Sequence, residues 1–102
     1  MYTYTTPTLP LTIDEIDFAE IDIFRVAIQQ DDVKEIKVIN GDAPCVDAEH
    51  KTIYLSLTQE ETAKYKEGGA KVQVRFKYNN GAVGATNKKS ITVDDVIDKV
   101  VI

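Results

Sequence analysis

The sequence predicts an all-β domain, an antiparallel β-sandwich with one short helix. Three observations lead to this fold class: segments in which apolar and polar residues alternate, turn signals between these segments, and a β-branched stretch over residues 16–30 that carries no helical stripe. Short alternating segments with turns about every 10 to 15 residues are typical of sandwiches, and we expect about six or seven strands.

The clearest strand is predicted at residues 71–79. Apolar residues at positions 72, 74, 76 and 78 alternate with Lys, Gln, Arg and Lys, which gives one dry face and one basic face. Asn80-Gly81 follows at once, and both residue types tolerate the positive φ that a type I′ hairpin turn requires. We therefore expect a return strand from Ala82.

A two-residue turn at this point places Tyr78 opposite Val83. Continuing that register brings lysine opposite an apolar position farther along, so we expect a kink or bulge near residues 86–89. Pairing should then resume at Ile91 and Val93, whose alternation again fits a strand.

A second alternating strand is predicted at residues 53–57, and a helix follows it. Thr58 and Glu61 have the spacing of a capping box, in which each side chain bonds to the other residue's backbone N–H. We expect a short helix over about residues 59–67, ended by Gly68-Gly69.

The first residues predict an extended arm followed by an edge strand. Residues 1–8 are rich in Tyr and Thr and have too few apolar residues to fold alone. Leu9, Leu11 and Ile13 alternate, and the neighbouring prolines (Pro7 and Pro10) restrict this segment to the edge of a sheet.

Residues 16–30 predict a strand with an irregularity. The apolar positions are odd up to Ile23 and even from Phe24, so we expect a bulge near these two residues. Asp31-Asp32 should form a turn, and residues 33–39 another strand.

The last residues give a weaker pattern, with a helical turn expected over residues 94–98 before an apolar Val100–Ile102. No linker or repeat divides the chain. The length of 102 residues fits a single β-sandwich domain over residues 1–102, for which an immunoglobulin-like arrangement is the expectation.

Composition bounds the function. Hydrophobic residues make up 43% and charged residues 28%, which is typical of a globular domain, and no apolar run has the length of a membrane span. One cysteine excludes an internal disulfide, and one histidine excludes a two-histidine metal site within one chain. We expect neither an enzyme nor a cofactor.

Charge is unevenly distributed along the chain. Residues 1–63 carry four basic and thirteen acidic groups, whereas residues 64–89 carry seven basic groups and one acid. Such asymmetry indicates either surfaces of opposite sign for partners or a fold in which the fields cancel. The candidate basic face comprises Lys71, Arg75, Lys77, Lys88 and Lys89. The net charge of −5 argues against nucleic acid as a partner.

Three other features have structural explanations. The acids at 14, 15, 17, 20 and 22 do not match a calcium loop and fit a solvated strand face. His50 beside Asp47 and Glu49 fits a polar turn, and Cys45 fits a buried, inert thiol.

Both ends of the chain are candidate docking segments. The arm that carries Tyr2, Tyr4 and Thr6 could add to the sheet edge of a neighbouring protein, or it could be a frayed terminus. Val100, Val101 and Ile102 are apolar and should be covered either by this domain or by another subunit.

Several motifs resemble a group of small proteins from phages and prophages of Gram-positive hosts. The most specific is Leu57–Thr62 (LTQEET) with Lys64-Tyr65 after it; the others are Thr6-Pro7-Thr8, Cys45 upstream of Ile53–Leu57, Val72–Arg75, Asn80-Gly81 with Ala85, and the final Val-Ile. The lysine-rich Asn87–Lys89 departs from the pattern. The resemblance implies a virion structural protein from the head, tail or fibre region, and carries no catalytic residues.

Two functions therefore follow as hypotheses. The first is a phage virion protein, made in the cytoplasm of the bacterial host, that docks in many copies on itself or on other virion proteins. The second is a module that binds host cell-wall carbohydrate through tyrosines on a sheet face and Asn79, Asn80 and Asn87 near one loop.

Overall fold

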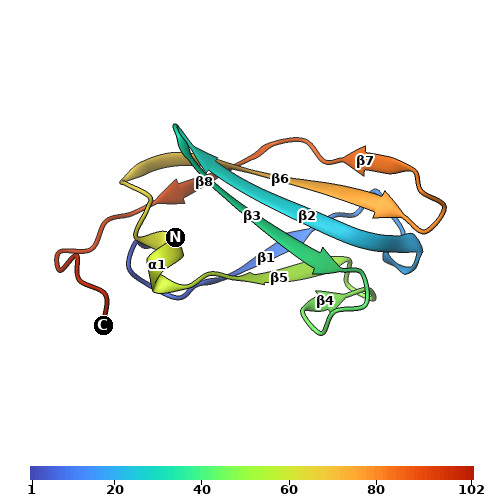
Figure 1. Ribbon diagram of the computed structural model, residues 1–102, viewed down its shortest axis with the longest axis horizontal. Coiled ribbons are helices and arrows are strands. Elements are labelled where there is room, and N and C mark those ends of the chain that lie inside the picture. The colour runs from blue at the N-terminus through green and yellow to red at the C-terminus, as the bar shows by residue number, and fades with distance from the viewer.

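The computed structural model describes residues 1–102 and shows two β-sheets packed face to face, with one short α-helix (Figure 1). The strands are β1 (Thr8–Thr12), β2 (Ile21–Gln30), β3 (Val33–Asn40), β4 (Val46–Asp47), β5 (Thr52–Ser56), β6 (Gly68–Tyr78), β7 (Val83–Ala85) and β8 (Lys89–Val93). The helices are a 3-10 turn, η1 (Phe18–Glu20), and α1 (Gln59–Thr62). Neither helix has the length and apolarity to cross a membrane.

The larger sheet has the order β3-β2-β6, and β7 and β8 pair one after the other with the far side of β6. The smaller sheet has the order β1-β5-β4, and every pair of named strands is antiparallel. The predicted fold class, mainly β with antiparallel sheets and one short helix, is confirmed. The immunoglobulin-like arrangement stays a prediction.

The core lies between the two sheets. Phe24, Val26 and Ile28 point inward from β2 and alternate with residues that face outward. β6 alternates in the same way, and β5 contributes Ile53 and Leu55 from the opposite sheet. Burying a side chain of this size stabilises a fold by about 1.5–3 kcal/mol, so these layers supply most of the favourable energy.

The β2–β3 hairpin has the predicted bulge and turn, but β2 begins later than predicted. The bulge lies between Ile21 and Ile23, next to the predicted position, and Asp31-Asp32 forms the turn. The strand expected from residue 16 begins only at Ile21. Asp17 accepts a hydrogen bond of 3.0 Å from the backbone N–H of Ala19, which favours a 3-10 turn before the strand.

The register of the β6–β7 hairpin differs from the prediction by one residue. Lys77 lies opposite Val83, where a two-residue turn would place Tyr78. The reason is the turn itself. A type I′ turn needs positive φ at both central residues, and of Asn80 and Gly81 only Gly81 has it, at 91°. Tyr78 N–H instead bonds to the carbonyl of Ala82 across a three-residue loop.

The predicted interruption after β7 is confirmed. β7 ends at Ala85, β8 begins at Lys89, and pairing with β6 resumes with Ile91 opposite Ala70 and Val93 opposite Gly68.

The capping box at the start of α1 is confirmed, but the helix is shorter than expected. Glu61 N–H bonds to the Thr58 hydroxyl at 3.2 Å, and the Thr58 N–H bonds to the Glu61 carboxylate at 2.8 Å. α1 ends at Thr62 because the chain then turns inward to bury Tyr65. Gly68 and Gly69, expected to end the helix, are instead the first residues of β6.

The smaller sheet confirms the predicted edge strand. β1 pairs only with β5, with Leu9 opposite Leu55 and Leu11 opposite Ile53. Pro10 lies at the middle of this edge strand, where a missing backbone donor is tolerated.

The helical turn expected over residues 94–98 is not formed. Residues 95–102 leave the body of the fold after β8 without helix or strand (Figure 1). The carboxylates of Asp94, Asp95 and Asp98 crowd this short segment, and like charges at helical spacing oppose a helix.

Candidate functional site

The outer face of the large sheet, turned away from the core, is basic and partly apolar. Because side chains alternate along a strand, the residues between the buried ones on β2, β3 and β6 share this side. We call it the basic sheet face; its basic residues are Arg25, Lys34, Lys71, Arg75 and Lys77. No Asp or Glu occupies a paired position on this face.

The positive charge of this face contrasts with the rest of the molecule. The whole chain has a net charge of −5, and the residues outside the basic sheet face carry seven basic and seventeen acidic groups. A positive surface on a molecule with a negative net charge attracts negatively charged partners and orients their approach.

Two arginines lie at the centre of the face without acidic partners. Arg25 on β2 is directly opposite Arg75 on β6, and the ion pairs of the structure all lie elsewhere. An open hollow of about 230 Å³ adjoins them, with further walls from Ile23, Val38, Phe76, Lys77 and Val83. Guanidinium groups bind carboxylates through paired hydrogen bonds, so this hollow suits an acidic group carried on an apolar surface.

A second hollow, of about 510 Å³, lies on the same side near the β2–β3 turn. It is mostly polar, and its basic residues are Lys71 and Lys88. Lys71 Nζ donates a hydrogen bond of 2.6 Å to Ser90 Oγ, which fixes this ammonium group at the border between β6 and β8.

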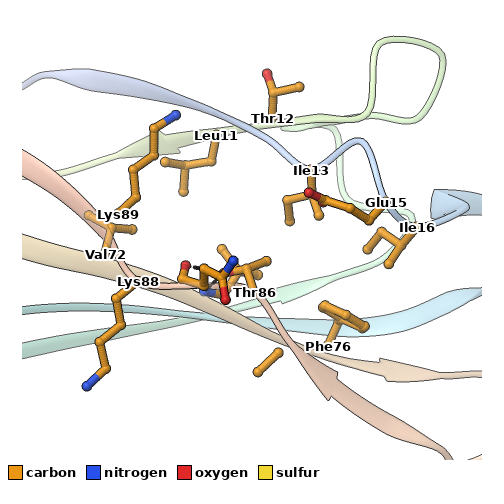
Figure 2. Close-up of a pocket in the computed structure, with 13 residues that line it drawn as sticks. Leu11, Thr12, Ile13, Glu15, Ile16, Val72, Phe76, Thr86, Lys88 and Lys89 are labelled. Carbon is orange, nitrogen blue, oxygen red and sulfur yellow. Dashed lines mark hydrogen bonds between the residues drawn. The ribbon is translucent and has the colours of Figure 1, made fainter.

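The structure brings together only part of the predicted basic set. Lys71, Arg75 and Lys77 share the basic sheet face, as their alternation indicates. Lys88, in the break before β8, lines the second hollow on the same side as Lys71, whereas Lys89, the first residue of β8, points to the opposite side (Figure 2).

Sequence reasoning missed Arg25 and Lys34. They lie on β2 and β3, so only the pairing of these strands with β6 places them on the same face. The even apolar positions of residues 24–28 were the available signal, because they put Arg25 on the outward side.

A groove of about 410 Å³ runs between the two sheets where β7 gives way to β8 (Figure 2). Leu11, Ile13 and Ile16 form one wall, and core residues of β6 such as Val72 and Phe76 form the other. It lies where residues 86–88 interrupt the strand pairing with β6 between β7 and β8. Its charged residues are Glu15, Lys88 and Lys89.

The start of the chain lies against β8 rather than extending from the domain. Thr3 N–H bonds to the carbonyl of Asp94 at 2.9 Å, and Asp94 N–H bonds to that of Met1 at 2.8 Å. Thr3 is fully buried, whereas Tyr2 keeps 56% of its surface exposed. Of the other arm residues, Tyr4 is half-buried and Thr6 exposed.

The last residues are apolar and uncovered. Ile97 and Ile102 are fully exposed, and Val100 and Val101 are exposed by 59% and 43%. Only the Gln59 side chain holds this end, through hydrogen bonds to the N–H and the carbonyl of Ile102 at 3.0 and 2.8 Å. The domain itself therefore does not cover Val100–Ile102.

Carboxylates and lysines from β3, α1 and the residues just after α1 form a cluster on the other side of β3. Lys37 Nζ lies 2.6 Å from Glu61, and Lys64 Nζ lies 3.7 Å from Glu35. A hydrogen bond between Glu35 and Glu61, helped by Lys37, lowers the pKa of Glu61 to about 2. The same bond, together with burial, raises the pKa of Glu35.

Tyr65 lies beneath this cluster. Burial, and then the charges of Glu35 and Glu61, raise its pKa to about 12. Its hydroxyl donates to the Ile28 carbonyl at 3.4 Å, so the ring packs as part of the core.

The remaining candidates from the sequence include one contact, between His50 and Asp47, and no larger cluster. His50 Nδ1 lies 2.7 Å from the Asp47 carboxylate in an exposed turn, where the pKa of Asp47 is lowered by this hydrogen bond. Cys45 is half-buried, whereas the sequence predicted a buried thiol. No group of three or more His, Cys, Asp or Glu side chains has the geometry of a metal site.

The tyrosines are not gathered into one binding surface. Tyr54 lies on the outer side of the small sheet, whereas Tyr78 packs edge-on against Phe76 at a ring separation of 5.6 Å. Tyr54 and Tyr78 therefore lie on different sheets.

A scan against protein-family models and searches of curated proteins and of solved structures each found no match.

Proposed function

We propose that the chain is a structural protein of a bacteriophage virion, from the head, tail or fibre region, which docks in multiple copies on other virion proteins. The observation that carries the proposal is the basic sheet face, where five basic residues and several exposed apolar ones lie on one side of a sheet without a single paired acid. The motifs that resemble small phage proteins, chiefly Leu57–Thr62, supply the virion setting.

The chemistry of this face defines its partner as an acidic protein surface with an apolar centre. Arg25 and Arg75 offer two unpaired guanidinium groups, and Val38 and Val83 are each 58% exposed beside them. Apolar contact supplies affinity, and the matching of charge selects the partner and its orientation.

The two ends of the chain supply further contacts in this proposal. Tyr2–Thr6 and Val100–Ile102 contact another chain in the assembled particle, because exposed apolar side chains such as Ile102 gain from burial there. A particle structure in which both segments are free in solvent would contradict this part of the proposal.

Mass spectrometry of purified virions from a host that expresses the gene tests the proposal. We expect the wild-type chain in the particles and at least about tenfold less of Arg75→Glu, because this change places a carboxylate against an acidic partner. Lys89→Glu is the matched control: it makes the same change of charge at an exposed residue off the basic sheet face and should be retained. Absence of the wild-type chain from the virions would overturn the proposal.

A further inference from the structure

The outer edge of β3 has an unpaired row of backbone groups. β3 pairs only with β2, and Gly41 N–H bonds to the Asp22 carbonyl just beyond the strand. Because bonded positions alternate in an antiparallel ladder, odd-numbered residues of β3 bond to β2 and even-numbered ones point their N–H and C=O outward. Lys34, Ile36 and Val38 have no other backbone partner.

This is the longest unprotected edge of the molecule. β3 has eight residues in unbroken register with β2, whereas β1 contains a proline, β4 has two residues, and the β7–β8 edge is interrupted. Ile36 and Val38 are 43% and 58% exposed along it. An exposed, flat, partly apolar edge is a template for pairing with another strand.

The sequence of β3 is complementary to itself when two copies run antiparallel. With Ile36 opposite Ile36, Val33 of each copy meets Ile39 of the other on the inner side. Glu35 meets Lys37 on that same side in two places. Each already has a partner in its own chain, Lys64 for Glu35 and Glu61 for Lys37, so the dimer would bring these two clusters of alternating charge together. Such cross-strand apolar and ionic pairs stabilise a sheet by about 0.2–1 kcal/mol each.

The backbone fits this register as well. Lys34 of one copy lies opposite Val38 of the other, and these positions and Ile36 all direct their N–H and C=O outward. Shifting the strands by two residues keeps the hydrogen-bonding positions but places Lys37 against Lys37 in one direction and Glu35 against Glu35 in the other. Charge therefore favours the register centred on Ile36 over both shifts.

We propose that a second copy of the chain pairs with the first through β3, antiparallel and about a two-fold axis, so that the two large sheets become one continuous sheet. This inference rests on the docking function proposed above, and the partner that it names is a second copy of the same chain. Ile36 and Val38 of both copies then meet on the outer side, and the two basic sheet faces form one continuous surface.

Sedimentation or light scattering of the purified chain tests this proposal. We expect a dimer for the wild type and a dissociation constant at least about tenfold higher for Val38→Lys. This substitution places a lysine opposite Lys34 of the other copy, in two places. Val83→Lys is the matched control: Val83 has the same 58% exposure as Val38 but lies on β7, and this variant should dimerise like the wild type.

A compensating variant and hydrogen exchange identify the contact itself. Lys34→Glu combined with Val38→Lys should restore the dimer, because each introduced charge then faces its opposite. In the dimer the amides of Lys34, Ile36 and Val38 should exchange slowly, and dilution should release them. A monomer at millimolar concentration, a dimer in which these amides exchange freely, or equal weakening by Val83→Lys would overturn the proposal.

The two proposals fail separately. A chain that dimerises but is absent from virions contradicts the virion function alone. A chain that enters virions but stays monomeric in solution, with β3 amides unprotected, contradicts β3 pairing alone.

Discussion

Arg25 on β2 and Arg75 on β6 lie directly opposite each other, and neither guanidinium forms an ion pair. Like charges at directly opposed positions of an antiparallel sheet destabilise it. The isolated domain therefore carries a small energetic cost at this position, which an acidic partner would remove.

We expect Arg25→Thr to raise the free energy of unfolding by about 0.2–1 kcal/mol, because it removes this repulsion and introduces a residue that favours strands. Urea denaturation measures the change, which should shrink as salt screens the wild-type repulsion. Lys89→Thr, at an exposed position opposite Val72, should show no such salt dependence. A destabilised Arg25→Thr would contradict the repulsion.

Gly41 is expected to tolerate no side chain. A Cβ at this position would lie 1.9 Å from the carbonyl oxygen of Ile21, a contact with backbone that no rotamer relieves. Gly41→Ala should destabilise the fold by about 2 kcal/mol or more, as seen in the thermal midpoint. At Gly69 an added Cβ meets nothing within 4 Å, so Gly69→Ala should be neutral or slightly stabilising.

Gln30 should be sensitive to the loss of its amide group. It is 5% exposed, and its side chain donates to the Lys66 carbonyl at 2.7 Å and accepts from the Lys66 N–H at 2.8 Å. Gln30→Glu removes the donor to the part-buried Lys66 carbonyl and places a carboxylate at a buried position, at a cost of about 1–3 kcal/mol. The exposed neighbour is the control: equal losses in Gln29→Glu and Gln30→Glu, measured by urea denaturation, would be inconsistent with this role.

Acid should weaken the fold through Glu61. Its pKa of about 2 lies below the usual value of 4.5, mainly because of the hydrogen bond with Glu35. Glu61 therefore contributes stability that is present above pH 4.5 and is lost as the pH falls toward 2. Glu35 has the opposite sign: its pKa is raised, so its contribution is present below 4.5 and is lost as the pH rises through the raised value.

Glu61→Gln keeps the side-chain oxygen that bonds to the Thr58 N–H and should flatten the acid decline of the urea midpoint between about pH 4.5 and 2. Glu60→Gln, at an exposed position on α1, should decline like the wild type. If Glu60→Gln and Glu61→Gln keep equal slopes, Glu61 is not the group responsible.

Local patterns predicted the elements well, because each depends on residues close together in the chain. The capping box of Thr58 and Glu61 and the turn at Asp31-Asp32 both form as expected. The hairpin register was wrong by one residue, since the sequence Asn80-Gly81 permits two turn types and only Gly81 takes positive φ.

The candidate site was harder to predict, because it depends on which strands become neighbours. The alternation within β6 gave Lys71, Arg75 and Lys77, but Arg25 joins them only through the pairing of β2 with β6. The apolar end of the chain was recognised from composition. The hydrogen bond between Thr3 and Asp94, just after β8, was not, because it joins residues that are far apart in sequence.

The hydrogen bonds of the first residues connect the N-terminal segment, β8 and α1, so these three segments should open cooperatively. The Met1 amino group donates to the carbonyl of Thr92 on β8, and residues 1–3 also bond to Asp94 just after β8. Thr62 of α1 bonds through its hydroxyl to both the N–H and the carbonyl of Thr5. β8 therefore cannot peel from β6 without loosening the first residues, and these in turn release α1. Native-state hydrogen exchange should find the amides of Thr3, Thr5 and Ile91 opening together, at a lower energy than the central strands.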